Sequence, residues 1–494
     1  MKNLKQKTLS GLIWSFIETT SSQLIGFIST IVLARILSPS DFGLIGMTIV
    51  ITALAQIFSD GGLSQALIRK QDCKDVDYST VFIINTLIGI SVYIIIFFLA
   101  PMIARFFNQP SLVSIIRVIS ISIPFNSLSI IQRTLITKKI DFKTQALISV
   151  IGAFFGFGVA IVLAIKGYGV WSLVYRSVIA QFVMLVLLWV LNNWRPKFVF
   201  SKKSFQELFG FGSNLLVIYS IATIFKNIYN IVIGKFYNST ILGYYTNADQ
   251  MSGLPAGILT TLFNKVAYPV LSSMQNNDVL LKYNIRKLEK PLLLITFTFM
   301  LFLAAIANSF IPLLFGNKWI MSVPYFQILC VAYMPSILHT VNQLIMNVKG
   351  QSRLFLITEI VKYIFFIPVV YLGIKYGVLV LLFGFMIHYW FGFIINASFS
   401  NKLIGYSIPE QIKDLSLPLF FAIIVSIFTY SIYMFTSHLN HITILFIQTM
   451  VALTISFLLL RYVRVFDYEV FFQTIKDFFY NSTKKMNESY GRFK

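Results

Sequence analysis

Hydrophobic and polar positions alternate along this chain on the scale of whole helices rather than of single residues. Each apolar window is close to the ~20 residues that an α-helix needs to cross roughly 30 Å of hydrocarbon. Strands of a membrane barrel would be about ten residues long and half polar, so the pattern predicts an all-α integral membrane protein. We expect fourteen transmembrane helices, at residues 12–34, 42–59, 79–100, 111–131, 145–165, 168–191, 211–234, 246–271, 291–314, 321–346, 354–374, 376–400, 415–436 and 440–463.

The loops between these windows alternate between rich and poor in Lys and Arg. The poor loops hold one basic residue each, at Arg35, Arg105, Lys166, Lys235, Lys318 and Lys375, or none, as between Thr436 and Asn440. Because basic loops are retained in the cytoplasm during insertion, both termini are predicted to lie inside (N-in/C-in). The basic-rich segments are Lys2–Lys7, Arg69–Lys74, Arg133–Lys143, Arg195–Lys203, Lys282–Lys290, Lys349–Arg353, Lys402–Lys413 and Arg461–Lys494.

The composition supports a membrane protein and offers little material for catalysis. Only 12% of the residues are charged and 57% are hydrophobic. The net charge of +22 is explained by cytoplasmic loops and anionic headgroups, so membrane lipids are expected partners and nucleic acid is not. Cys73 and Cys330 offer no disulfide or metal spacing, and no G-x-x-x-x-G-K-[ST] motif occurs. We therefore expect no enzyme activity, no catalytic residue, no metal and no cofactor.

A short internal sequence repeat divides the chain into two similar parts. A shift of 200 residues places Ala34–Leu44 over Gly234–Tyr244, with a lone basic residue and a glycine in register, and a slightly longer shift places Ile165–Val170 over Gly373–Val378. Both pairs lie in predicted outward loops, which indicates two parallel six-helix lobes, an architecture typical of transporters. The predicted parts are an N-lobe with helices 1–6, a C-lobe with helices 7–12, an extra C-terminal helix pair and a cytoplasmic amphipathic tail, at 1–200, 201–405, 406–465 and 466–494.

Three segments carry a family resemblance: Ala34–Gly43, Ser59–Ile68 and Val266–Gln275. The chain resembles, over essentially its whole length, Wzx-type polysaccharide flippases, and more narrowly the WzxC-like branch of the multidrug/oligosaccharidyl-lipid/polysaccharide (MOP) exporter superfamily. The resemblance implies a multi-pass protein of the bacterial inner membrane. Such a protein moves an undecaprenyl-pyrophosphate-linked oligosaccharide from the inner to the outer leaflet for lipopolysaccharide, capsule or exopolysaccharide synthesis. It also implies that helices one, two, seven and eight line the cavity.

Charged residues inside the windows are the candidate site. A charge at a helix centre costs about 2.5–3.5 kcal/mol on insertion scales, so these side chains should face the protein interior or a wet cavity. The basic excess favours an anionic ligand, and a pyrophosphate suits Arg and Lys. The predicted substrate-binding residues are Arg117, Arg176, Lys226, Lys265 and Lys362, and the predicted carriers of a coupling cation are Glu18 and Glu359.

Simpler interpretations stand beside these assignments. Lys265 and Arg117 lie near helix ends, where a long side chain can snorkel to the membrane surface. Glu359 and Lys362 are spaced i, i+3 and can pair with each other. The rival functions are a lipid II flippase, a drug or metabolite exporter of the same superfamily, and a non-transporting scaffold of a glycan-polymerising complex. A monomer is expected, with a polysaccharide polymerase as a candidate partner.

Overall fold

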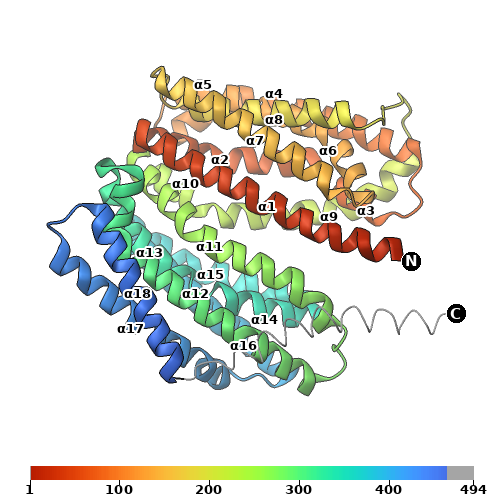
Figure 1. The fold of residues 1–494 in the computed structure, drawn as a ribbon. Helices are drawn as coiled ribbons and strands as arrows, with labels where there is room; N and C mark the ends of the chain where they lie inside the picture. Colours follow the sequence, from red (N-terminus) through yellow and green to blue (C-terminus); the bar gives the residue numbers. More distant parts are fainter. Residues whose placement is uncertain (1, 464–494) are drawn as a thin grey trace. The chain divides into compact units, whose positions relative to one another are not determined.

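The structure is a computed structural model that describes residues 2–463. Inside its helices, the description omits the side chains of residues 2–13, 15, 16, 211, 214, 215, 262, 265, 266, 269, 352, 355, 356, 462 and 463. Within residues 2–463 the regular elements are eighteen α-helices and one short 3₁₀ helix, with no strand (Figure 1), which confirms the all-α prediction. The predicted tail at 466–494 lies outside the described residues.

Most of the predicted windows coincide with helices that can cross a membrane. Twelve helical segments of the described chain are long and apolar enough to do so, or thirteen if one bent pair counts as a single span. That pair is α9 (Lys202–Lys226) and α10 (Ile228–Phe236), bent by 46°, and it corresponds to the window 211–234. The window 246–271 lies in α11 (Ser239–Ser272), which is not among these segments. The count of fourteen and the N-in/C-in orientation stay predictions.

Contacts divide the chain into two compact units, Met1–Asn247 and Ala248–Lys494. The predicted lobe boundary at residue 200 stays a prediction, but α9 and α10 pack against helices of the first unit, above all α2. The first unit contains α9, α10, the start of α11, and α1 (Lys2–Ile36), α2 (Pro39–Asp60), α3 (Leu63–Arg69), α4 (Asp75–Phe106), α5 (Leu112–Ile119), α6 (Ser122–Lys138), α7 (Phe142–Ile165) and α8 (Trp171–Leu191).

Close helix packing in the first unit depends on small residues. A Cβ atom built on Gly156 of α7 would lie 2.6 Å from the Arg176 carbonyl oxygen of α8, and one on Gly152 would lie 2.4 Å from Met184 Cγ. Without side chains at these two positions, the α7 and α8 backbones approach closely and gain dispersion contacts, as is common between helices in membranes. The α7–α8 pair thereby fixes where α8 points its polar residues.

The second unit holds the rest of α11 and the extra helix pair. It contains α12 (Asp278–Phe315), η1 (Asn317–Ser322), α13 (Val323–Tyr333), α14 (Ser336–Val348), α15 (Ser352–Tyr376), α16 (Val378–Ile404), α17 (Ile408–Thr436) and α18 (His441–Val463). The pair α17–α18 packs on α12, with Phe421, Val425 and Ala452 at the centre of an apolar cluster. Asp414 of α17 adds charged bonds, since it accepts from Arg286 Nε at 2.6 Å and Nη2 at 2.8 Å.

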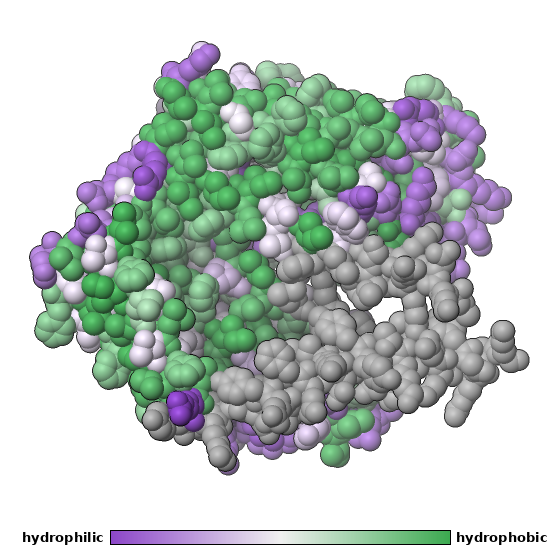
Figure 2. Space-filling view, in the orientation of Figure 1, coloured by the Kyte–Doolittle hydropathy of each residue, from purple (hydrophilic) through white to green (hydrophobic). Residues whose placement is uncertain are grey.

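The outer surface is suited to lipid. Large apolar side chains such as Phe98, Phe154 and Phe435 are exposed by 74%, 65% and 78%. In Figure 2 apolar residues cover most of the coloured face in view, and hydrophilic residues gather toward its margins. In water such a surface would aggregate, whereas in a bilayer it contacts acyl chains. The fold and this surface therefore describe a multi-pass membrane protein, in agreement with the predicted inner-membrane location.

The orientation has a direct test. We expect a cysteine at Lys318 to react with an impermeant maleimide in intact spheroplasts, and cysteines at Lys202 and Lys287 to react only after lysis, because basic-rich loops stay inside. The background would carry Cys73→Ser and Cys330→Ala, since Cys73 is partly accessible and Cys330 is buried. Equal labelling of the positions 202 and 318 in intact cells would contradict the predicted topology.

Candidate functional site

A polar centre lies among the helices of the first unit. Glu18 of α1 turns toward α7, where its Oε1 accepts hydrogen bonds from Ser149 Oγ at 2.9 Å and from Gln145 Nε2 at 3.3 Å. These bonds hold the carboxyl group inside the unit rather than toward lipid. Glu18 is therefore placed as an interior acid, which is the position that its predicted role in ion coupling requires.

Arg133 joins this centre, although the sequence pattern assigned it to a cytoplasmic basic cluster. Helix α6 continues to Lys138, and Arg133 lies within a candidate membrane span, close enough to Glu18 and Asp60 for their opposite charges to act on it. The predicted window ended at residue 131, before Arg133, whereas the helix continues and the residues after Arg133, Thr134 to Ile136, are buried. The sequence signal that was overlooked is the pair of apolar residues Leu135 and Ile136, which shows that the helix continues past Arg133.

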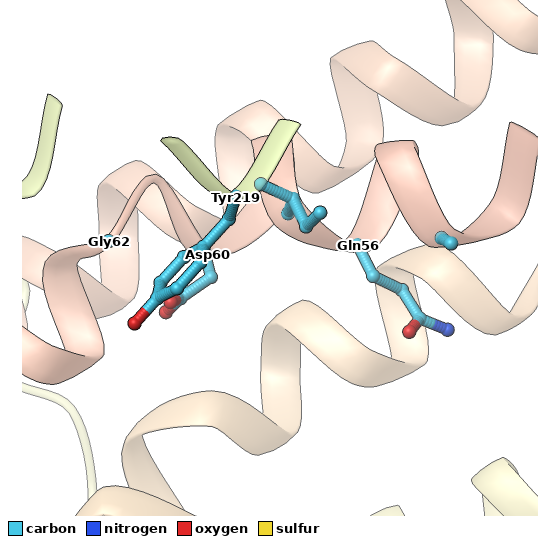
Figure 3. Close-up of a pocket in the computed structure, with 6 residues that line it drawn as sticks. Gln56, Asp60, Gly62 and Tyr219 are labelled. Carbon is cyan, nitrogen blue, oxygen red and sulfur yellow. The ribbon is translucent and has the colours of Figure 1, made fainter. Parts of the chain in front are cut away.

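Asp60, at the end of α2, borders a cavity of about 350 Å³. The cavity is lined by Ala53, Gln56, Ile57, Asp60, Gly62 and Tyr219. Figure 3 shows the Tyr219 ring beside the Asp60 carboxyl group, with Gln56 farther along α2. Asp60 Oδ2 accepts from Ser64 Oγ at 2.8 Å, which fixes its side chain. Residues of α2 and α9 line this cavity. These helices correspond to the predicted helices two and seven, which the family resemblance places around the cavity.

Arg176 of α8 reaches inward. Its Nη2 atom lies beside Gly26, 3.9 Å from where a Cβ atom would stand on that residue of α1. Gly26 is ten residues from the end of α1 at Ile36, or about 15 Å along the helix, so the guanidinium does not snorkel. Within the described part of the chain, Arg176 has no hydrogen-bond partner and no nearby carboxylate offsets its charge.

Arg117 has a clear structural partner instead. Its Nε donates to the Phe97 carbonyl oxygen at 3.2 Å, and its guanidinium lies 4.3 Å from the Phe97 ring centre. Pro101 follows Phe97 by four residues and has no N–H, so the Phe97 carbonyl lacks its helical donor. Arg117 supplies that donor. Its role in substrate binding stays a prediction.

Lys226 lies at the break between α9 and α10. It is the last residue of α9, its side chain is exposed, and the chain bends by 46° at the next residue, Asn227. Broken helices in transporters place unsatisfied backbone groups and polar side chains at the substrate site. An exposed ammonium inside a span is costly in lipid, which favours a wet cavity at this position.

In the second unit, Glu359 and Lys362 of α15 bond to each other, and Gln343 Nε2 also donates to Glu359 Oε1 at 3.2 Å. The two charges therefore offset each other, as the simpler interpretation of this pair expects. Whether either residue contacts a substrate or an ion stays a prediction. The side chain of Lys265 is outside the described part of the structure, so its predicted role in substrate binding stays a prediction.

Within residues 2–463, no three His, Cys, Asp or Glu side chains are grouped so that they could hold a metal ion. The interior instead holds separate charges on different helices: Glu18, Asp60, Arg133 and Arg176 in the first unit. This arrangement can bind and release charged groups.

Three comparisons place the chain among known proteins. A family model described as "Polysaccharide biosynthesis protein" matches residues 32–324. The lipopolysaccharide biosynthesis protein WzxC of Escherichia coli K12 is 26% identical over 87% of this chain and 88% of its own length. The teichuronic acid biosynthesis protein TuaB of Bacillus subtilis is 24% identical over 72% of this chain and 74% of its own.

Solved structures show the same fold. The lipid II flippase MurJ in an inward closed conformation has a TM-score of 0.75 at 18% identity and covers 90% of this chain and 97% of its own. An inward-facing multidrug transporter of the MATE family, a member of the MOP superfamily, has a TM-score of 0.59 at 14% identity and covers 78% and 98%. At these identities the likeness concerns the fold alone.

Proposed function

Because the chain belongs to the polysaccharide biosynthesis family whose model matches residues 32–324, we propose that it moves lipid-linked oligosaccharides from the inner to the outer leaflet of the bacterial inner membrane. The relatives include proteins named for lipopolysaccharide, teichuronic acid and succinoglycan biosynthesis, the last called a transport protein. The MOP-type fold supports alternating access, in which helix bundles rock around a fixed site. The cargo in this proposal is an undecaprenyl-pyrophosphate-linked repeat unit.

The observation that carries this proposal is the unpartnered, inward-pointing guanidinium of Arg176. A desolvated charge costs several kcal/mol unless a partner offsets it, and no described protein group near Arg176 does so. A pyrophosphate would supply the missing charge through bidentate hydrogen bonds, which Arg forms well. The exposed ammonium of Lys226, at the break between α9 and α10, is the second group that we assign to the anionic headgroup.

Energy coupling forms a separate part of the proposal. Glu18 is held inside the first unit by α7, and the charges of Glu18 and Asp60 both act on Arg133. A proton or Na⁺ bound to these carboxyl groups would weaken their electrostatic attraction to Arg133. We therefore assign Glu18 as the coupling acid. Glu359 is less suited, because Lys362 already offsets its charge.

Reconstitution tests the proposed activity. We expect the purified protein to move a fluorescent undecaprenyl-pyrophosphate oligosaccharide between the leaflets of sealed vesicles without any nucleotide. Protein-free vesicles would give the baseline, and lipid II and an organic cation in the same vesicles would test the two rival transport functions. Leaflet exchange at the protein-free rate for every lipid would instead favour the scaffold.

Deletion tests the same activity in cells. In a strain without a redundant flippase, loss of this protein should leave the lipid-linked repeat unit at the inner leaflet while its synthesis continues. The measurement is the amount of lipid-linked oligosaccharide in isolated membranes together with surface polymer. Normal surface polymer in that strain would contradict the proposal.

A further inference from the structure

Two carboxyl groups meet at one phenol where α17 docks on α12. The Tyr406 hydroxyl, in the segment between α16 and α17, lies 3.1 Å from Glu289 Oε2 of α12 and 3.0 Å from Asp414 Oδ2 of α17. Glu289 is only 1% exposed, and Tyr406 is fully enclosed. Because α12 is 38 residues or about 57 Å long, its first turns extend beyond the roughly 30 Å of hydrocarbon. Glu289 precedes the predicted window 291–314, at the end of α12 predicted to face the cytoplasm.

One phenol hydrogen cannot serve both carboxyl groups. A phenol has a single O–H donor, whereas an ionised carboxyl group can only accept. Arg286 and Lys290 pair with Asp414, so Asp414 is the ionised member and accepts the Tyr406 hydrogen. Glu289 Oε1 has no hydrogen-bond partner in the part of the chain that the structure describes. The contact between Glu289 Oε2 and the phenol oxygen is then a hydrogen bond when Glu289 is protonated and donates.

Burial favours the same protonation state. An ionised carboxyl group is costly to remove from water unless a cation pairs with it, so the neutral acid is the stable form of Glu289 in this site. Accordingly, burial raises the pKa of Glu289 to about 8. The charged and titratable groups that act on it are Tyr406, Asp414 of α17, and Arg286 and Lys290 of α12. The two cations favour the ionised form, but both are already bonded to Asp414.

We propose that Glu289 holds a proton at neutral pH and that this proton is a latch between α12 and α17, which a rise in cytoplasmic pH releases. With the proton, Glu289 donates to the Tyr406 oxygen and Tyr406 donates to Asp414, so a chain of hydrogen bonds joins the two helices. Without it, two carboxylates compete for one hydrogen and repel each other. The competing explanation is a permanent cluster in which both carboxyl groups are ionised, and it predicts no sensitivity to alkaline pH. The latch does not depend on which cargo the protein carries.

Thermal unfolding of the full chain in detergent, at neutral and at alkaline pH, tests the latch. A glutamate in the unfolded chain has a pKa of about 4.3, so the contribution of the proton to stability is complete below that value and is lost as the pH rises through about 8. From about pH 7 to pH 9 we expect the folding equilibrium constant to fall about tenfold, which lowers the midpoint by roughly 3–6 °C for a unit of this size. Glu289→Gln should remove this fall, since its amide cannot ionise and still donates to the Tyr406 oxygen.

Glu410→Gln is the matched control. Glu410 also lies in the first turns of α17, but Lys282 Nζ bonds both of its carboxyl oxygens at 2.8 Å and lowers its pKa. Glu410 therefore stays ionised from neutral to alkaline pH. Its replacement should lower the midpoint by the same amount at both pH values, and the pH-dependent fall of the parent should remain.

Infrared difference spectra detect the proton itself. The parent at neutral pH should show the C=O stretch of a neutral carboxylic acid, which Glu289→Gln lacks and Glu410→Gln keeps, and alkaline pH should remove it. Should Glu289→Gln fail to fold, Tyr406→Phe is the second variant, and it should shift this band because the acid loses its acceptor. Absence of the band from the parent, an unshifted band in Tyr406→Phe, or equal alkaline falls of the midpoint in the parent and Glu289→Gln would each overturn the latch.

Discussion

Replacing Arg176 by glutamine is expected to lower the apparent affinity for the lipid-linked oligosaccharide ~10–100-fold while the protein becomes more stable. The loss corresponds to about 1.5–3 kcal/mol for a charged hydrogen bond to the anionic headgroup. The gain in stability follows because the guanidinium has no partner that offsets its charge among the described residues. Transport into vesicles and thermal unfolding, measured on the same preparations, would show the two opposite changes.

Arg117→Gln is the matched control, because Arg117 also lies in a candidate span of the first unit but donates to the Phe97 carbonyl. That substitution should lower stability by about 1–3 kcal/mol, since it leaves the carbonyl freed by Pro101 without a charged donor. Its transport should follow the amount of folded protein. If Arg176→Gln instead transported like the parent, or lost activity only in proportion to its lower stability, Arg176 would not contact the headgroup.

Replacing Asp414 by alanine is expected to destabilise the protein by about 1.5–3 kcal/mol, the contribution of hydrogen bonds to a charged group, because the two cations left behind are partly exposed. The Asp414 side chain is only 3% exposed and bonds Arg286, Lys290 Nζ at 3.0 Å and the Tyr406 hydroxyl at 3.0 Å. Burial, together with the nearby Glu289 and Asp414, raises the pKa of the Tyr406 phenol, which therefore stays neutral and donates. Without Asp414, two cations lose their acceptor where α17 docks on α12, and the Tyr406 hydroxyl keeps only Glu289 Oε2, at 3.1 Å.

Asp278→Ala is the control for this second prediction. Asp278 pairs with Lys349, but its side chain is 51% exposed, so its loss should cost less than about 1 kcal/mol. Thermal unfolding in detergent, with fluorescence of the six tryptophans as the signal, compares the two variants. Equal stability of Asp414→Ala and Asp278→Ala would show that the Asp414 cluster does not hold α17 on α12.

Much of the fold was predictable because membrane insertion depends on local composition. The apolar windows predicted helices, and twelve of them coincide with helical segments able to cross a membrane. Two predicted windows have no counterpart among these twelve segments. One is interrupted by the bend after Lys226, and the other lies in α11. The two glycines that the 200-residue shift aligns, Gly43 and Gly243, also lie close together in the structure, and the two-lobe division stays a prediction.

The site was less predictable, because polar contacts depend on how helices rotate and slide against one another. The pairing of Glu359 with Lys362 was visible in their i, i+3 spacing. Pro101 showed that the Phe97 carbonyl would need a donor, but not that Arg117 would supply it from another helix. The contact of Arg133 with this polar centre was missed because a single charge ended an apolar window, although the helix and its buried face continue beyond it.

The sequence by itself determined that the chain is helical and that its helices suit a membrane. These properties follow from hydrophobicity and period, which each segment carries alone. Only the tertiary structure decided that Arg176 points toward Gly26 without a partner, whereas Arg117 is bound to a carbonyl. The physical reason is that hydrophobicity belongs to each segment by itself, whereas the role of a charge inside a span depends on which group from a distant helix offsets it.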